Sequence, residues 1–346
     1  MPTISFDGRA SLDIASYGRK GPGRRDHVSS AEVDHIRRTV RRTPEVMVKV
    51  LSHGGQDLKS IGRHFDYLGR NGDLDIETDD VRALTGKGAE KALLEDWDLD
   101  VGVLRRRPDL EPRKVRNPPK LVHKLMFSMP AGTPPDKVFA AVKNFAREEF
   151  GLQHRYAMVL HTDEPHPHAH MVIKAMSEHG VRLNIKKATL RAWRAQFAAQ
   201  LRKQGIAANA TERAVRGFSK TRKTDGIYRA ARRGYSSHLS ERARSIAQDL
   251  RDGVTPYEPG RATVHKTGRQ VGNGWQALGG LLEAQGLADL AREVRRFNEE
   301  LPTVRTEGEW VATELRNRPD LAQRSSVPLY PPPPRTNPHV GQDLSR

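Results

Sequence analysis

An α+β fold built on an antiparallel sheet of about five strands is predicted for this chain of 346 residues. Two apolar segments of strand length, 155–161 and 168–175, are separated only by the turn ThrAspGluProHisPro, which favours a hairpin near the centre of the sheet. In other segments the apolar residues recur at helical spacing, which places helices beside the sheet. Further strands are expected at 46–51, 74–78 and 121–129, and helices at 57–70, 88–97 and 135–150.

The helix expected at 57–70 has a clear start, face and end. Asp57 is a candidate N-cap, and AsnGly at 71–72 is a typical stop. The apolar residues between them recur every three or four positions and share one face: Leu58, Ile61, Phe65 and Leu68.

Tyr67 lies on the opposite face of this helix, about 180° from the apolar stripe at about 100° per residue. Arg63 and Arg70 fall within about 60° of it, so the phenol is expected between two cations. A phenol with a pKa of ~10 is barely ionised at neutral pH, and nearby cations or a metal raise the reactive fraction. Tyr67 is therefore a candidate nucleophile. Tyr228 and Tyr235 compete with it, although base stacking or phosphate contact fits those two equally well.

Composition predicts a soluble, cytosolic protein that binds a polyanion. The chain has no cysteine, no apolar segment of membrane-spanning length and no apolar stretch near its start, and its net charge is +17. Residues 181–244 contain 17 Lys or Arg and 3 Asp or Glu, whereas 1–180 contain 29 and 26 and 245–346 contain 13 of each. One stretch therefore holds most of the excess, which is typical of a nucleic-acid footprint.

Six regions are expected along the chain from composition and periodicity. They are a flexible basic leader (1–44), a mixed core (45–188), a basic helical DNA-binding region (189–252), a linker (253–275), a small helical segment (276–317) and a Pro-rich disordered tail (318–346).

Four histidines lie within ten residues of the hairpin: His161, His166, His168 and His170. Alternate residues of a strand share a face, so His168 and His170 project together, and the partner strand brings a third imidazole across from them. Three neutral imidazoles that converge on one point form a cation site. The spacing of His166, His168 and His170 also fits the histidine-triad nucleotide hydrolases, which act through a His nucleophile without metal, although Pro167 would interrupt their strand.

Together these elements resemble a known family. HFDYLGRNGDLDIE around Tyr67, HTDEPHPHAHMVI from His161, and GVRLNIKKATLRAWRAQFAAQLRKQGI resemble the relaxases of mobilisable plasmids and the related T-DNA border endonuclease, of the HUH class of single-strand nucleases. The resemblance covers roughly residues 45–220 and implies that the mixed core at 45–188 is an HUH nuclease core.

The resemblance also implies roles for individual residues. Tyr67 would attack one DNA strand at an origin of transfer and form a covalent 5′-phosphotyrosyl intermediate. His161, His168 and His170 would hold a divalent metal, with His166 as the alternative third ligand. Asp163 would orient a ligand or accept the phenolic proton, although Pro165 stands where some relatives have an acidic residue.

Substrate, metal and partners follow from the same resemblance. Single-stranded and supercoiled plasmid DNA at the origin is the expected substrate, with accessory relaxosome proteins and a coupling protein as partners in the bacterial cytoplasm. Mg²⁺ or Mn²⁺ is implied, whereas imidazole ligands alone favour later transition metals. The residues expected to contact DNA are Arg63, Arg70, Lys186, Lys187, Arg191, Arg194, Arg202 and Lys203. Besides the nucleotide hydrolase, a DNA-binding protein without enzymatic activity remains an alternative.

Overall fold

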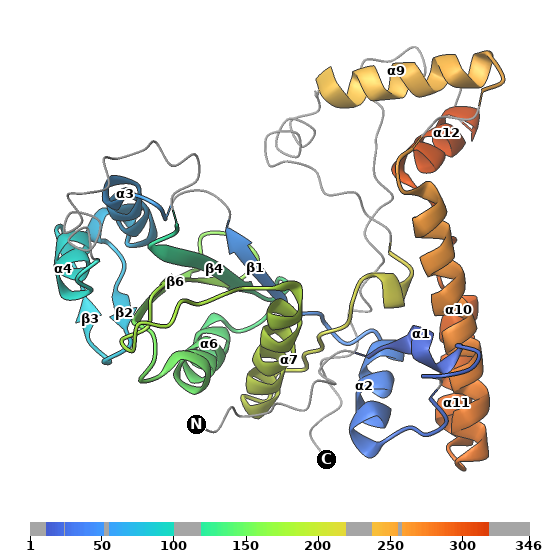
Figure 1. Ribbon diagram of the computed structural model, residues 1–346, viewed down its shortest axis with the longest axis horizontal. Coiled ribbons are helices and arrows are strands. Elements are labelled where there is room, and N and C mark those ends of the chain that lie inside the picture. Colours follow the sequence, from blue (N-terminus) through green and yellow to red (C-terminus); the bar gives the residue numbers. More distant parts are fainter. Residues whose placement is uncertain are drawn as a thin grey trace. The chain divides into compact units, whose positions relative to one another are not determined.

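The computed structural model describes residues 12–23, 25–51, 55–99, 119–218, 237–254 and 258–317 (Figure 1). Contacts divide the chain into two compact units. One unit runs from Thr43 to Ala210, and the other combines Leu12–Arg42 with the chain from Thr211 onward. Within the described ranges, no helix is both long enough and apolar enough to cross a membrane.

The first unit contains a six-stranded antiparallel sheet in the order β1-β4-β6-β5-β2-β3. The predicted α+β fold is therefore confirmed, with the histidine hairpin β5–β6 inside the sheet. The sixth strand, β3, is only two residues long, too short for a periodic signal in the sequence. The strands are β1 (Met47–Leu51), β2 (Ile76–Thr78), β3 (Ala83–Leu84), β4 (Val122–Ser128), β5 (Tyr156–His161) and β6 (His168–Lys174).

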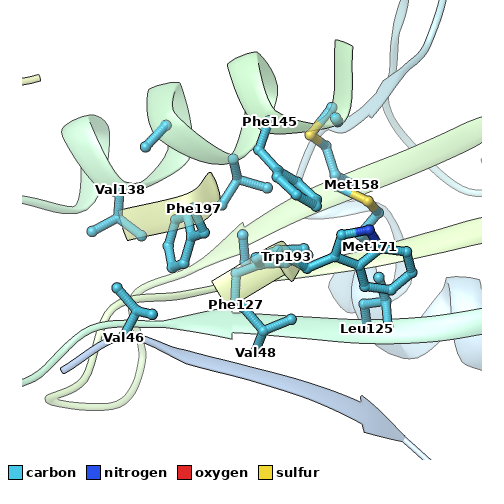
Figure 2. Close-up of a cluster of buried hydrophobic side chains, with 14 of the residues drawn as sticks. Val46, Val48, Leu125, Phe127, Val138, Phe145, Met158, Met171, Trp193 and Phe197 are labelled. Carbon is cyan, nitrogen blue, oxygen red and sulfur yellow. The ribbon is translucent and has the colours of Figure 1, made fainter. Parts of the chain in front are cut away.

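Helices cover both faces of this sheet (Figure 1). On one face α6 (Pro135–Phe150) and α7 (Lys187–Lys203) pack over Leu125 and Phe127 of β4. Figure 2 shows how Phe145, Trp193 and Phe197 fill this core. On the other face α3 (Leu58–Leu68) and α4 (Ala89–Asp96) pack over the alternate strand residues, which include Val122, Val159 and Val172.

Helix α3 forms as its sequence predicts. The Asp57 side chain accepts a hydrogen bond from the Ser60 amide at 2.7 Å, which satisfies one of the amides that a helix start leaves unpaired. Ile61, Phe65 and Leu68 are each at most 1% exposed. A short 3-10 turn, η1 (Arg70–Gly72), follows, in which Arg70 and Asn71 adopt positive φ.

The second unit is helical. Its core joins Ile14 and Ile36, near the start of the chain, to Trp275, Val294 and Phe297. Its helices are α1 (Ile14–Tyr17), α2 (Ser30–Val40), η2 (Ala214–Arg216), α9 (Ser237–Arg251), α10 (Arg261–Ala284), α11 (Ala288–Glu299) and α12 (Glu307–Asn317).

The prediction of a flexible leader at 1–44 is wrong for the residues of this range that the structure describes. Residues 30–40 form α2, whose Ser29 and Glu32 make a capping box, and Tyr17 and Ile36 are buried in the helical unit. These few apolar residues lack a clear period by themselves, and the partners that bury them come from about 240 residues later in the chain.

The expected linker at 253–275 is also wrong from residue 261 onward, where α10 begins. Its glycines suggested a flexible segment, but two of them, Gly268 and Gly274, are points of close packing. A Cβ on Gly274 would lie 2.1 Å from the Ile14 carbonyl oxygen, and one on Gly268 would lie 2.7 Å from the Val304 side chain.

The expected boundary at 188/189 divides α7, which runs from Lys187 and packs in the core of the first unit. The tail at 318–346 lies outside the described residues, as do 219–236 of the basic region with Tyr228 and Tyr235.

Candidate active site

Strand register brings the hairpin histidines together. His161 of β5 lies directly opposite His168 of β6, and His170 lies opposite Val159. Val159 belongs to the core beneath α3, so alternation places the three imidazoles on the face of the sheet that α3 covers.

The three histidines form a compact group. One ring nitrogen from each of His161, His168 and His170 lies within 4.8 Å of the others, and the ring centroids are 4.9–5.3 Å apart. His161 is 1% exposed and His170 is 6% exposed. His166 is exposed and lies outside this group.

Hydrogen bonds leave a ring nitrogen of each imidazole available for a metal. His161 donates from Nε2 to the Leu68 carbonyl at 2.8 Å, and its buried Nδ1 has no partner. His168 donates from Nδ1 to the His166 carbonyl at 3.0 Å, which leaves its Nε2 available. The buried Nδ1 of His170 also has no partner. A carbonyl that fixes one ring nitrogen as the donor leaves the other as the acceptor a metal needs, so the group fits a divalent cation.

Burial also favours the neutral ligand form. Burial lowers the pKa of His170 to about 3, and the charges of His161 and His168 act in the same direction. Burial likewise lowers the pKa of His161, partly opposed by its hydrogen bond to Leu68. Both rings are neutral at neutral pH, as metal binding requires.

Tyr67 lies over this group at the exposed end of α3. Its ring centroid is 6.2 Å from that of His161 and 6.5 Å from that of His170, and the residue is 53% exposed. The His161–Leu68 hydrogen bond ties the last turn of α3, which carries Tyr67, directly to a candidate ligand. The structure thus brings together the candidate nucleophile and the three candidate ligands.

Arg70 and Asp163 form an ion pair beside the Tyr67 ring. The Arg70 guanidinium lies 5.0 Å from the centre of the Tyr67 ring and pairs with the Asp163 carboxylate. Burial raises the pKa of Asp163, but its own backbone hydrogen bond and the Arg70 charge outweigh this and lower it. Asp163 is thus ionised at neutral pH and holds Arg70 beside the phenol, a placement that suits orientation better than proton acceptance.

Sequence reasoning missed His64, which packs against the site from α3. Its ring stacks on Tyr67 with centroids 6.3 Å apart and meets the edge of His170 at 6.5 Å. Burial lowers its pKa to about 4, and the Lys124 and His161 charges add to this effect. Its position three residues before Tyr67 was the available signal, since residues at this spacing are neighbours on a helix.

The basic residues expected on α7 do not join this site. Trp193, Phe197 and Leu201 of α7 pack in the core on the opposite face of the sheet from the histidines. Several of its cations bind protein groups: Arg194 donates to the Val48 carbonyl, Arg202 donates to the Ala208 carbonyl, and Lys203 pairs with Glu148.

The other expected DNA contacts divide between the two faces. Arg63 is exposed on α3 and donates to the Lys59 carbonyl, on the histidine face. Lys186, Lys187 and Arg191 lie at the start of α7, with Lys186 as its N-cap residue.

Comparison with known proteins points to one family. Residues 107–206 match the family model "Relaxase: MobA/VirD2-like, nuclease domain", a range that contains the hairpin histidines and Asp163 but not α3. The T-DNA border endonuclease VirD2 of Agrobacterium fabrum is 26% identical over 228 residues, which cover 61% of this chain and 49% of the relative. VirD2 of Rhizobium radiobacter is 24% identical over 251 residues (64% and 58%), and that of Rhizobium rhizogenes is 27% identical over 190 residues (50% and 42%). The chain thus matches about half the length of these curated relatives.

Proposed function

We propose that this chain, a relaxase related to VirD2 with a nuclease domain of the endonuclease and strand-transferase class, nicks and rejoins one DNA strand at an origin of transfer. The observation that carries this proposal is the exposed Tyr67 ring over three clustered imidazoles. The substrate is single-stranded DNA within a supercoiled plasmid or conjugative element, whose mobilisation the nick initiates in the bacterial cytoplasm. Accessory relaxosome proteins and a coupling protein are the expected partners.

The proposed reaction is a transesterification. The Tyr67 phenolic oxygen loses its proton and attacks the scissile phosphorus, the bond to the 3′ oxygen breaks, and that oxygen becomes a hydroxyl. The 5′ phosphate remains esterified to Tyr67. Because the ester replaces one phosphodiester by another, a 3′ hydroxyl can reverse the step and rejoin the strand.

Protein groups supply position and charge in this reaction. His161, His168 and His170 would hold a divalent cation, Mg²⁺ or Mn²⁺ by family resemblance, which when bound neutralises charge on the non-bridging phosphate oxygens. Arg70, held by Asp163, places a second positive charge beside the phenol, where the phosphate would be attacked. The Leu68 carbonyl accepts a hydrogen bond from His161, which orients the imidazole and holds the last turn of α3 beside the three histidines.

A covalent adduct tests this proposal directly. A single-stranded oligonucleotide from the origin region, labelled at its 3′ end, should migrate with the protein on a denaturing gel and survive mild acid. Mass spectrometry should locate the adduct on the peptide that contains HFDYLGR, and Tyr67→Phe should abolish it. An adduct that persists in Tyr67→Phe would move the nucleophile to another tyrosine.

The same gel separates the two rival functions. A histidine-triad hydrolase would give a phosphoramidate, which mild acid cleaves. A DNA-binding protein without enzymatic activity would give no adduct at all.

A further inference from the structure

Lys124 of β4 is a buried cation that the reaction described above does not use. It is only 4% exposed, and strand alternation places it on the α3 face, between Leu51 of β1 and Val172 of β6. Lysines are almost never fully buried unless they are paired. Within the described ranges, Lys124 forms no ion pair or hydrogen bond, and Asp57 at the start of α3 acts on it only through its charge.

Two imidazoles, of His64 and His170, also lie near Lys124. Among nearby charges, that of Lys124 lowers the pKa of His64 the most. The buried Nε2 of His64 has no hydrogen-bond partner. His170 is diagonal to Lys124 across β4 and β6, within reach of a long side chain. One side of the site thus gathers an ammonium that forms no ion pair and an imidazole nitrogen that has no hydrogen-bond partner, within the described residues.

A pair of groups that consists of an ammonium without an ion pair and an imidazole nitrogen without a hydrogen-bond partner complements an anion. It does not suit a cation, because the ammonium would repel one, and His64 lies outside the group of three that fits a metal. An ammonium is an established partner of phosphate, and a neutral imidazole can add a second hydrogen bond.

We propose that Lys124 and His64 form a phosphate-binding recess for the DNA backbone, one turn of α3 away from Tyr67. The nature of the ligand, a phosphodiester, rests on the proposed function. Because His64 lies three residues before Tyr67, the phosphate in the recess belongs to a nucleotide beside the cleavage point rather than to the scissile bond itself. The Lys124 ammonium, fixed in the sheet, would set the position of the DNA strand. The next phosphate of the DNA would then reach the Tyr67 phenol and the histidines.

A matched pair of lysines tests this recess. Lys49 of β1 is exposed and on the same face of the sheet, so Lys49→Met removes the same charge as Lys124→Met. Both changes are made in the full-length chain with Tyr67→Phe, in chelator, and binding of an oligothymidylate is followed by fluorescence anisotropy. Lys124→Met should weaken binding about tenfold or more, the worth of a charge-assisted hydrogen bond, whereas Lys49→Met should weaken it less than about twofold. Lys124→Arg should retain most of the affinity.

Stability separates a binding role from a structural one. Lys124→Met should leave the melting temperature unchanged or raise it, because an unpaired buried charge is replaced by an apolar chain of similar length. His64→Asn tests the other half of the recess and should also weaken binding several-fold, even if Lys124→Met fails to fold. Equal affinities of the two Met variants, or unchanged affinity in His64→Asn, would overturn the recess. Since binding is read without metal or nucleophile, failure of the wild-type protein to nick DNA would refute the proposed function and leave this comparison intact.

Discussion

Arg70 is the residue through which the environment of Tyr67 is most directly tested, since its guanidinium lies 5.0 Å from the centre of the ring. Arg70→Ala removes a positive charge beside both the phenol and the incoming phosphate. We expect cleavage to slow on the order of tenfold or more, measured as single-turnover adduct formation. Arg63→Ala is the matched control on the same helix, because the Arg63 guanidinium donates to the Lys59 carbonyl of its own helix. Equal rates in the two variants would remove Arg70 from the mechanism.

The histidine group gives a second prediction at the same scale. His168→Ala should abolish cleavage and leave the melting temperature and oligonucleotide binding close to those of the wild type, because His168 is only half-buried at the start of β6. His166→Ala should cleave normally, since that side chain is exposed and outside the group. Chelator should reproduce the loss and added Mg²⁺ or Mn²⁺ should reverse it. Full activity in chelator would show that the three imidazoles do not act through a metal.

The lowered pKa of His64 predicts how the free energy of unfolding depends on pH. Its pKa of about 4 in the folded protein is below the reference value of ~6.5, so between these values the unfolded chain takes up a proton that the folded chain does not. Its contribution to the free energy of unfolding is therefore complete above about pH 6.5 and falls as the pH approaches about 4.

Urea unfolding between pH 7 and 4 in chelator measures this effect. The loss from His64 should be on the order of 1–2 kcal/mol, reduced from the full shift because the ring is partly exposed. His64→Gln should flatten the curve by this amount, whereas His179→Gln, at an exposed site, should follow the wild type. Superimposable curves for all three proteins would show that His64 is not buried in solution.

At the scale of elements, α10 contains glycines of opposite consequence. Gly274 packs against α1, and a Cβ there would lie 2.1 Å from the Ile14 carbonyl oxygen, whereas Gly280 has open space around it. Gly274→Ala should therefore destabilise the protein by about 2 kcal/mol or more, as overpacking does. Gly280→Ala should stabilise it by about 0.5–1 kcal/mol through helix propensity. Thermal unfolding of the two variants decides whether α1 packs on α10 in solution, because similar midpoints would contradict that contact.

Helix α7 shows how element packing changes the interpretation of charge. Its sequence alternates cations with apolar residues, and this pattern is consistent both with DNA binding and with packing in the core. The structure buries Trp193 and Phe197 on the face away from the histidines, and Arg194 and Arg202 donate to backbone carbonyls. A large part of the positive charge on this helix thus supports the fold.

At the scale of the molecule, the two units predict where the chain can be divided. A fragment of residues 43–210 contains every described residue of the first unit, whereas one that ends at 180 loses α7 and its part of the core. Circular dichroism should show cooperative unfolding for 43–210 and not for 43–180. Cooperative unfolding of the shorter fragment would contradict the packing of Trp193 and Phe197.

The fragment 43–210 also separates the contribution of the basic stretch to DNA binding from the reaction at Tyr67. Residues 211–244 contain ten Lys or Arg and three Asp or Glu, and 43–210 lacks them. The fragment should still form the Tyr67 adduct, but it should bind DNA more weakly and with a shallower dependence on salt. The slope should fall by about 0.7 for each DNA phosphate that the fragment no longer neutralises. An unchanged slope in the folded fragment would show that the basic stretch does not bind DNA.

The sequence by itself determined the local features of this protein. The spacing of apolar residues and the Asp57 cap predicted α3, and the alternation of His168 and His170 predicted a shared face, because both depend only on the helix and strand repeats. The resemblance to relaxases favoured Tyr67 over the other candidate tyrosines and His161 as the third ligand.

Only the tertiary structure decided what depends on contacts between distant segments. It placed α7 on the face of the sheet opposite the histidines, packed residues 30–40 against the helices after 261, and showed that Gly268 and Gly274 of α10 are packing contacts rather than linker signals. It also brought His64 and Lys124, 60 residues apart, to the edge of the histidine group. A helical or strand repeat fixes which residues share a face, but the identity of the opposing face depends on the long-range burial of apolar surface, which no local pattern contains.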